Sequence, residues 1–278
     1  MNSLFCFGYG YTAGHLARTL PEGWQVGGTV RHKNGKPGTQ LFGDALDLSH
    51  ITHLLISIPP EEAGDPVLLR YRSTLEAARN LRWIGYLSTT GVYGDHGGGT
   101  VDETTPPAPT SERSRRRVVA EQEWLCFGKQ HGVPVQIFRL AGIYGPGRNA
   151  LEDLKEGTAK RIVRPGQFFS RIHVDDIAAV LRAALLVHTG SGIYNVCDDE
   201  PAPPAEVVSY AADLLGVDPP PEIPFEQAAL SPMALTFWAD NKRVDNRRMK
   251  EELGVGLTYP TYREGLKSLL ITRPSAEL

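Results

Sequence analysis

Short apolar runs alternate with helix-like segments along the first half of the sequence. The runs contain few polar residues, which is typical of strands buried on both faces of a parallel sheet. Between them, apolar residues recur three or four positions apart, as on one face of an amphipathic helix. The predicted strands span residues 4–7, 24–30, 51–58, 83–88 and 134–140, and the predicted helices span residues 12–20, 66–80 and 118–131. This order predicts an α/β fold, a doubly wound parallel sheet with helices on both faces.

The pattern becomes looser after about residue 145. Predicted helices span residues 149–157, 174–188 and 205–215, a short strand spans 193–196, and a last helical portion ends near residue 270. We predict a main domain of residues 1–145 that is rejoined by about 171–197, a smaller C-terminal substrate lobe of 146–170 and 198–272, and a tail of 273–278. The lobe is expected to lie over the carboxyl edge of the sheet, where ligands of doubly wound folds bind.

Composition and charge favour a folded protein with a small-molecule partner. Hydrophobic residues make up 41% of the 278 residues, and the formal net charge of −3 gives no reason to expect nucleic acid or an anionic membrane as a partner. Cys6, Cys126 and Cys197 lie far apart without CxxC spacing, which fits a reducing compartment. No apolar run approaches the roughly 20 residues of a membrane span. We therefore expect a cytoplasmic protein without a membrane partner.

A glycine-rich turn joins the first predicted strand to the first predicted helix. It reads Gly8-Tyr9-Gly10-Tyr11-Thr12-Ala13 and matches the pattern G-x-G-x-x-G/A. The first glycine permits a tight turn, the second lets the backbone approach a pyrophosphate, and the third small residue permits close packing of helix and strand. The N-terminus of the helix attracts the anion. This context predicts a dinucleotide-binding Rossmann domain.

The end of the second predicted strand favours NADP over NAD. A site that prefers NAD places a carboxylate there for the ribose hydroxyls, whereas a cation suits the 2′-phosphate of NADP. This segment carries Arg31 and Lys33, and no carboxylate occurs between Glu22 and Asp44. The alternative is an ordinary solvated basic turn.

Four segments, in their order along the chain, resemble the short-chain dehydrogenase/reductase superfamily, and specifically its extended epimerase/dehydratase branch. They are Gly43-Asp44, the stretch YLSTTGVYGD at 86–95, the stretch FRLAGIYGPG at 138–147, and the stretch IHVDDIA at 172–178. The resemblance implies an NADP site that involves Gly8, Tyr9, Gly10, Tyr11, Thr12, Ala13, Arg31, Asp44, Ser57, Ile58, Pro59, Ser88, Arg117, Leu140 and Ala141.

The catalytic residues that this branch uses are a Ser or Thr, a Tyr and a Lys. Thr89 matches the hydroxyl position that orients the substrate. Because Glu121 matches the Glu that follows the lysine by four residues, Arg117 stands at the lysine and Arg113 at the tyrosine. Arginine does not deprotonate in proteins, so Arg113 cannot act as a base. The sequence therefore resembles an atypical member with an altered catalytic set.

The substrate side of the resemblance also departs from the branch. Nucleotide-sugar enzymes of the branch often carry Asn where this sequence has Gly142, and a cation where it has Phe169; Arg171 stands two positions later instead. These changes weaken the case for a nucleotide sugar. Tyr93, and also Asp95, His96 and Tyr144, are available as replacement acids or bases, although a structural role is the alternative for each.

Three other chemistries are less favoured by the sequence. His173, Asp175 and Asp176 resemble a metal cluster, but a helix-capping carboxylate is the preferred interpretation. The basic residues Arg113, Arg115, Arg116 and Arg117 would point in different directions on a helix, which does not indicate a nucleic-acid face. No G-x-S-x-G elbow of a serine hydrolase occurs.

Two classes of function remain. The first is an NADP-dependent oxidoreductase or epimerase that acts on a small, anionic or sugar-like substrate. The second is a non-catalytic, NADP-binding, redox-sensing protein. The replacement of the Tyr-Lys pair by Arg113 and Arg117 separates the two. Either class is expected as a monomer or a homodimer.

Overall fold

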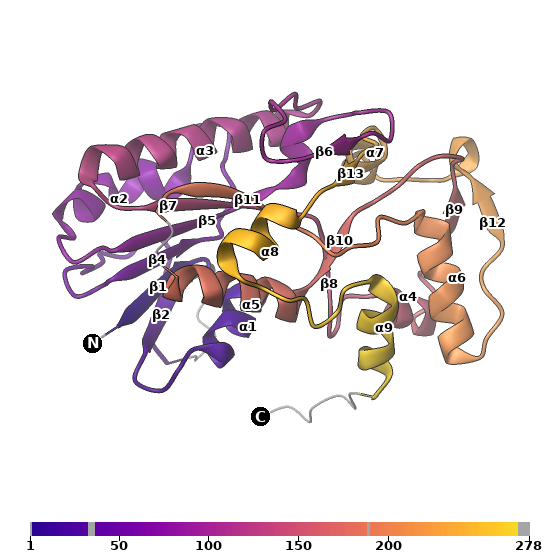
Figure 1. The fold of residues 1–278 in the computed structure, drawn as a ribbon, viewed down its shortest axis with the longest axis horizontal. Helices are drawn as coiled ribbons and strands as arrows, with labels where there is room; N and C mark the ends of the chain where they lie inside the picture. The colour runs from indigo at the N-terminus through magenta and orange to yellow at the C-terminus, as the bar shows by residue number, and fades with distance from the viewer. Residues whose placement is uncertain (1, 33–36, 188–189, 272–278) are drawn as a thin grey trace.

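The computed structural model describes residues 2–32, 37–187 and 190–271, and it is built around one parallel sheet (Figure 1). The strands of this sheet follow the order β3-β2-β1-β4-β5-β7-β11. They are β1 (Ser3–Phe7), β2 (Gln25–Val30), β3 (Thr39–Leu41), β4 (His53–Ile56), β5 (Trp83–Thr89), β7 (Val135–Leu140) and β11 (Gly192–Val196). The direction of the strand order reverses between β1 and β4, and ligands of such folds bind in the crevice at this point. The prediction of a doubly wound α/β fold is confirmed.

Helices cover both faces of the sheet (Figure 1). They are α1 (Tyr11–Thr19), α2 (Pro66–Ala77), α3 (Glu112–His131) and α5 (Val174–Leu186). Apolar residues of α2 and α3, such as Leu68 and Trp124, form one buried core with the sheet. Those of α1 and α5, such as Leu16 and Leu181, form a second core on the opposite face. The near-continuous apolar strands are explained by these two cores, since the central strands β1, β4, β5 and β7 are buried on both sides.

A smaller lobe lies beyond the carboxyl ends of the strands. It includes α4 (Ala150–Lys155), α6 (Pro204–Leu215) and α9 (Tyr262–Ile271), and its apolar core contains Leu151, Ala211 and Leu266. Short parallel strand pairs complete this end of the molecule: β8 (Gly142–Tyr144) with β10 (Arg171–His173), β9 (Arg161–Val163) with β12 (Glu222–Pro224), and β6 (Thr100–Val101) with β13 (Arg243–Val244).

The last predicted helical portion consists of three separate helices. They are α7 (Pro232–Trp238), α8 (Arg247–Leu253) and α9. Met249 and Leu253 of α8 pack in the core of the main domain, beside α5, and not in the lobe. The lobe therefore does not extend without interruption from residue 198 to residue 272, and the tail predicted at 273–278 lies outside the described residues.

Helix α3 begins earlier than its apolar pattern predicts. The prediction begins at residue 118, whereas the helix begins at Glu112, with Ser111 as its N-cap. The Ser111 side chain accepts a hydrogen bond from the Ser114 N–H, which satisfies one of the free amides at the helix start. Two turns of helix therefore consist of mostly charged residues, and these turns place Arg113 and Arg117 at the carboxyl edge of the sheet.

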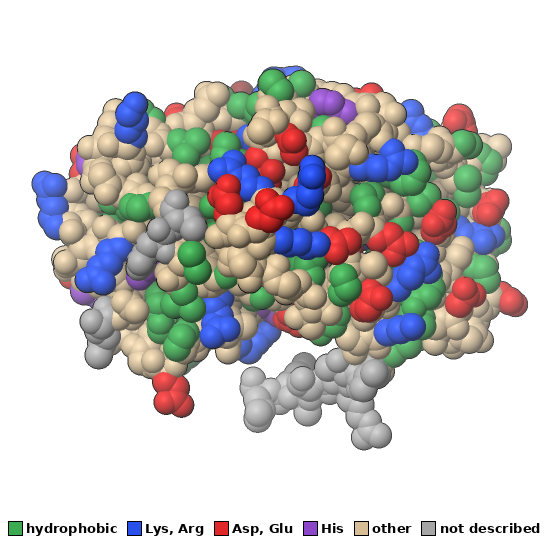
Figure 2. All heavy atoms as spheres, viewed as in Figure 1, with side chains coloured by type: hydrophobic (Ala, Val, Ile, Leu, Met, Phe, Trp, Pro, Cys, Tyr) green, Lys and Arg blue, Asp and Glu red, His purple; other side chains and the backbone are tan. Residues whose placement is uncertain are grey.

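The surface carries both signs of charge. On the face that Figure 2 shows, Lys and Arg side chains alternate with Asp and Glu, without a field of one sign. Among the described residues, no helix is long and apolar enough to cross a membrane.

Candidate functional site

The glycine-rich turn leaves the N-terminus of α1 free for a ligand. Gly8 has a φ of +91°, and a Cβ at this residue would lie 2.6 Å from Ser57 Oγ, so both conformation and space require glycine. Gly10 is the N-cap of α1; no side chain caps this helix, and its first turn has no acidic residue. A Cβ at Gly10 would meet no atom within 4 Å. The turn therefore offers backbone N–H groups and open space to an anion.

A cleft of about 680 Å³ lies next to this turn, in the size range of small-molecule sites. The predicted site residues that line it are Gly10, Tyr11, Thr12, Ser57, Ser88, Thr89, Arg113, Arg117, Leu140 and Ala141. The predicted residues that do not line it are Gly8, Tyr9, Ala13, Arg31, Asp44, Ile58, Pro59 and Tyr93. Lys33 lies outside the described residues. The ends of β1, β4, β5 and β7 therefore converge on one cleft.

Arg117 is fixed in the wall of the cleft. Its Nη1 donates to the carbonyl oxygen of Leu87 (2.5 Å) and to the hydroxyl of Tyr86 (3.3 Å), and the side chain is 8% exposed. Its Nε is buried and has no hydrogen-bond partner among the described residues. A buried guanidinium with spare donors is costly unless a ligand completes its hydrogen bonds.

Arg113 lies on the same helix at the rim of the cleft. Its guanidinium carbon is 5.8 Å from the centre of the Phe237 ring, and the side chain is exposed. Partial burial and the charge of Arg117 lower the pKa of Arg113. The pair thus brings two neighbouring positive charges to the position at which the family resemblance expects Tyr and Lys.

Thr89 ends β5 and faces the cleft. Its hydroxyl oxygen accepts a hydrogen bond from the Gly91 N–H (3.1 Å). This leaves the O–H proton available to donate to a substrate oxygen.

Tyr93 does not reach the cleft, so its geometry does not support the catalytic prediction. The ring is 0% exposed, and the hydroxyl donates to Asn195 Oδ1 (2.7 Å). The Arg139 guanidinium carbon lies 4.9 Å from the ring centre. Burial raises the pKa of Tyr93, which opposes formation of a phenolate. Sequence reasoning could not separate Tyr93 from Thr89, because both end the same strand-to-helix segment.

The other predicted acids and bases have structural contacts. Asp95 accepts hydrogen bonds from the N–H groups of Gly97 and Asn241, and the latter bond is the main cause of its lowered pKa. His96 Nε2 lies 3.1 Å from the Tyr93 carbonyl oxygen. Tyr144 is buried, which raises its pKa. None of the three lines the cleft.

The cap of α5 is a histidine and not the predicted carboxylate. His173 Nδ1 accepts a hydrogen bond from the Asp175 N–H (3.2 Å). Asp175 instead lies 2.6 Å from His15 Nδ1, and Asp176 accepts hydrogen bonds from the N–H groups of Thr258 and Tyr259. The carboxylates of this segment therefore tie α5 to α1 and to the chain before α9, which the sequence pattern alone could not show.

Sequence reasoning missed the residues that close the outer half of the cleft. The C-terminal segment contributes Phe237, Trp238, Asp240 and Lys242, and the loop before β10 contributes Phe168. Arg148, directly after the Gly-Pro-Gly turn of residues 145–147, also lines it. Only the position of Arg148 after this turn could have indicated a site residue. Phe168 lies four residues before the stretch at 172–178, whereas the residues of the C-terminal segment are far from any motif and reach the cleft through tertiary folding.

Asp198 lies directly behind the cleft, beside Arg171. Its backbone N–H donates to the Arg171 carbonyl oxygen (2.7 Å). The residue is 1% exposed, and its Oδ2 has no hydrogen-bond partner among the described residues. Burial raises the pKa of Asp198 to about 8. Near neutral pH the folded protein thus holds a proton on Asp198 that the unfolded chain has already released.

We expect the free energy of unfolding to fall less steeply with rising pH in Asp198→Asn than in the unmodified protein. Between the ordinary pKa of 3.8 and the folded value of about 8, the folded state binds the extra proton, so unfolding becomes easier as pH rises. A difference of one bound proton between the folded and unfolded states changes the free energy of unfolding by about 1.4 kcal/mol per pH unit. Urea unfolding from pH 5 to pH 8 measures the slope. Asp213→Asn, at an exposed position of α6, is the matched control, and identical slopes for the two variants would contradict the assignment.

Comparison with known proteins places the chain in a family. A model of the NAD dependent epimerase/dehydratase family matches residues 69–197. Protein YeeZ of Escherichia coli (strain K12) is 30% identical, over 94% of this chain and 97% of that protein. The chain belongs to the NAD dependent epimerase/dehydratase family. The family assignment made from the sequence is thus confirmed.

Two further relatives show the range of this similarity. The structure of a functionally unknown conserved protein from Silicibacter pomeroyi DSS is 49% identical, with a TM-score of 0.91, and covers 97% of this chain and 98% of that chain. A 3-diazoavenalumate denitrifying reductase of a Streptomyces species is 29% identical, over 77% of this chain and 75% of that protein.

Proposed function

We propose that this protein is an NADP(H)-dependent oxidoreductase that acts on a small anionic substrate without a Tyr-Lys pair. The observation that carries the proposal is Gly10. Its missing Cβ opens into free space at an uncapped helix N-terminus beside the cleft. This is the space that the pyrophosphate of a dinucleotide needs.

The residues of the cleft fit a nicotinamide dinucleotide. The amides at the start of α1 would hold the pyrophosphate, and Arg148, next to this turn, would add a positive charge. Arg117 would donate to the ribose of the nicotinamide half, and its Nε has no hydrogen-bond partner among the described residues. Leu140 and Ala141 would form the apolar surface against the nicotinamide. When bound, the cofactor supplies or accepts a hydride.

The chain's own residues would orient the substrate and stabilise negative charge. The Thr89 hydroxyl would donate to the substrate oxygen, because its acceptor side is already bound to the Gly91 N–H. Arg113 and Arg117 are permanent cations that would stabilise charge developing on this oxygen. Neither arginine can take up a proton as a base, so the proton that such a reduction needs would come from solvent at the open rim.

The relatives support a redox role. The Streptomyces relative is named as a reductase, and it matches most of this chain. The family model also describes NAD-dependent proteins. The second function considered, a redox-sensing NADP-binding protein, is favoured by one observation, the replacement of the Tyr-Lys pair by Arg113 and Arg117.

Turnover measurements with Thr89 variants test the oxidoreductase. Oxidation of NADPH is followed with a panel of small carbonyl and aromatic acid substrates, and cofactor binding is followed by NADPH fluorescence. Thr89→Ser keeps the hydroxyl and is expected to retain turnover, whereas Thr89→Val is expected to lose it with cofactor affinity unchanged. Tight cofactor binding without turnover on any substrate would favour the redox sensor instead.

Arg31→Asp is expected to reverse the preference for NADP(H) over NAD(H). Arg31 is exposed just after the end of β2, where the adenine ribose of a dinucleotide would lie. Loss of one charge-assisted contact to the 2′-phosphate costs about 1.5–3 kcal/mol. Fluorescence titration with both cofactors measures the ratio. Arg82→Asp makes the same change of charge directly before β5, at the end of the sheet where the strands begin, and serves as control. Equal or better affinity of the unmodified protein for NAD(H) would contradict the prediction.

A further inference from the structure

We propose that the outer half of the cleft binds an aromatic carboxylate, with its ring on the wall formed by Phe168, Phe237 and Trp238 and its carboxylate at Arg171 and Arg113. The proposal rests on the proposed function, because it names the substrate class for the same cleft. It is carried by two features that come together there: an aromatic wall, and arginines that form no salt bridge within the described part of the chain.

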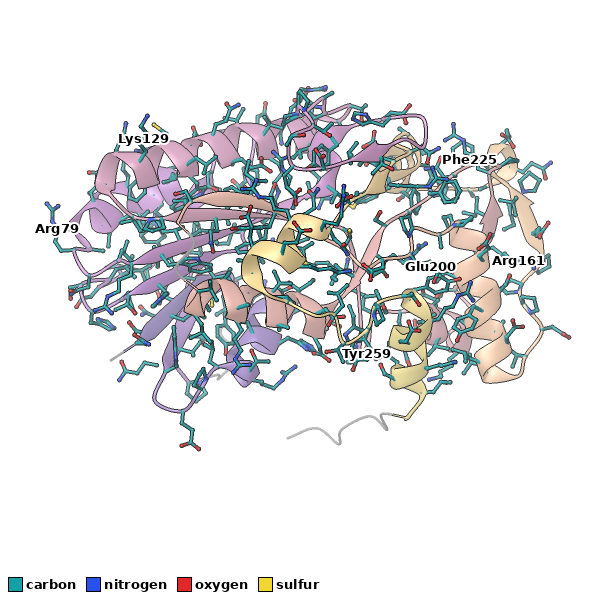
Figure 3. The ribbon with its side chains drawn as sticks, viewed as in Figure 1. Arg79, Lys129, Arg161, Glu200, Phe225 and Tyr259 are labelled. Carbon is teal, nitrogen blue, oxygen red and sulfur yellow. The ribbon has the colours of Figure 1, made fainter. Side chains whose placement is uncertain are left out.

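The aromatic wall is held rigidly. The Trp238 ring lies 5.2 Å from the ring of Phe169, edge to face, and 5.2 Å from the ring of Phe225, which is labelled in Figure 3. The Trp238 carbonyl oxygen accepts a hydrogen bond from Arg164 Nη1 (2.6 Å). Trp238 is 6% exposed, yet it lines the cleft. A planar aromatic ring can therefore stack on a surface that is already in position.

Phe237 extends this wall to the rim. It is 52% exposed, an unusual position for a large apolar ring, and it lines the cleft from the end of α7. The Arg113 guanidinium faces it at 5.8 Å from the ring centre. A ligand ring that packs on the exposed part of Phe237 would cover this side chain and leave an acidic group of the ligand within reach of Arg113.

The cleft has more positive charge than its own acidic groups compensate. Among the described residues, its lining contains one carboxylate, Asp240, and five cations: Arg113, Arg117, Arg148, Arg171 and Lys242. Within the described part of the chain, none of the four arginines forms a salt bridge. The phosphates of the cofactor would account for Arg148 and Arg117, which leaves Arg113, Arg171 and Lys242 for the substrate.

Arg171 is positioned for a carboxylate at the base of the wall. Its Nη1 donates to the carbonyl oxygens of Phe169 (2.8 Å) and Ala202 (3.1 Å), which fixes the plane of the guanidinium. The side chain lines the cleft, and no hydrogen bond engages its Nε or Nη2 among the described residues. These two donors match the two oxygens of a carboxylate. The nearby Asp198 carboxyl, with a pKa of about 8, is largely neutral at pH 7 and does not cancel this charge.

Lys242 adds a third donor. It is 8% exposed, and its Nζ donates to the Gly94 carbonyl oxygen (2.9 Å) and to Asp240 Oδ2 (3.3 Å). An ammonium has three protons, so one remains for a ligand. Asp240 itself accepts a hydrogen bond from the Thr110 hydroxyl (2.6 Å). The one acidic group of the lining is thus already engaged on two sides and does not oppose binding of an anion.

The wall of this half of the cleft is apolar. It consists of Phe168, Phe169, Phe237 and Trp238, with Ile143 and Ala234 beside them. Gly142, exposed in the lining, contributes no side chain. Stacking on the aromatic wall and a bidentate arginine together favour a planar ring that carries an acid.

Calorimetric titration with three probes tests the proposal. The probes are trans-cinnamate, its methyl ester, and 3-cyclohexylpropanoate, an acid without a flat ring; each is titrated with and without saturating NADP⁺. Cinnamate is expected to bind about tenfold or more tightly than either of the other two, because they lack the charged hydrogen bonds or the stacked ring. NADP⁺ binding is measured separately.

Variants locate the binding site. Arg171→Met and Arg113→Met are each expected to weaken cinnamate binding by about tenfold without changing binding of the ester. Arg113 is exposed, so its variant remains informative if loss of the buried hydrogen bonds of Arg171 impairs folding. Phe237→Ala is expected to weaken cinnamate more than 3-cyclohexylpropanoate. Arg182→Met, on the exposed side of α5, is the control.

The outcomes separate this inference from the proposed function. Any one of three results overturns the inference, whether or not NADP⁺ binds. They are failure of cinnamate to bind, equal affinity for the acid and its ester, and unchanged cinnamate affinity in both the Arg113 and the Arg171 variant. Selective binding of cinnamate that both variants lose supports it. A protein that binds cinnamate in this way but not NADP⁺ would overturn the proposed function alone.

Discussion

Replacement of Gly10 by valine is expected to abolish binding of NADP(H) and NAD(H) while the protein still folds. Gly10 has φ −104° and ψ −152°, a conformation open to any residue, and a Cβ there meets no protein atom within 4 Å. The valine side chain would therefore fill the space of the pyrophosphate and not strain the protein. A displaced pyrophosphate loses several charge-assisted hydrogen bonds of about 1.5–3 kcal/mol each, so affinity should fall by about a hundredfold or more.

The measurement is NADPH fluorescence titration, with circular dichroism and thermal unfolding as checks of the fold. Gly256→Val is the matched control, because a Cβ at exposed Gly256 also meets no atom within 4 Å but lies outside the cleft. Undiminished cofactor affinity in Gly10→Val would show that the dinucleotide does not use this turn, and the proposed function would then fail.

Replacement of Glu121 by alanine is expected to lower the free energy of unfolding by about 3–5 kcal/mol. Glu121 and Arg139 form an ion pair with an N–O distance of 2.7 Å, and both residues are 2% exposed. Ser88, next to the cleft, donates a hydrogen bond to the same carboxylate. Without Glu121, the charge of Arg139 stays buried without its counter-charge, and the Ser88 hydroxyl loses its acceptor.

Urea unfolding measures this loss. The double variant Glu121→Leu with Arg139→Met removes both charges and is expected to recover most of the stability, because no unpaired charge remains. Glu152→Ala breaks an exposed pair with Lys155, 3.0 Å apart, and should cost less than about 1 kcal/mol. A Glu121→Ala variant as stable as the Glu152→Ala control would show that the buried pair adds nothing to stability.

The sequence predicted most strands of the main sheet and the residues at its carboxyl edge that line the cleft, since these depend on local patterns. The apolar strands and the glycine-rich turn are visible in a few consecutive residues, and the strand ends they predict converge on the cleft at Gly10, Ser57, Thr89 and Leu140. The placement of Arg113 and Arg117 followed from the spacing to Glu121, which the structure shows on the same helix.

The outer half of the cleft could not be predicted in this way. Trp238 and Lys242 come from a segment some 100 residues after β7, and no periodic pattern marks them. They reach the cleft because β13 pairs with β6 and because Lys242 donates to the Gly94 carbonyl oxygen across the fold. Tyr93 illustrates the reverse error: it follows Thr89 by four residues, yet its ring is directed into the core.

The two arginines of α3 have a consequence for how ligands arrive. A tyrosine–lysine pair changes its charge with pH, whereas two guanidinium groups stay positive throughout the physiological range. The contribution of these two arginines to the attraction of an anion is therefore set by salt concentration and not by acidity. Encounter with a charged metabolite should be fast in dilute buffer and become slower as ionic strength shortens the reach of the field.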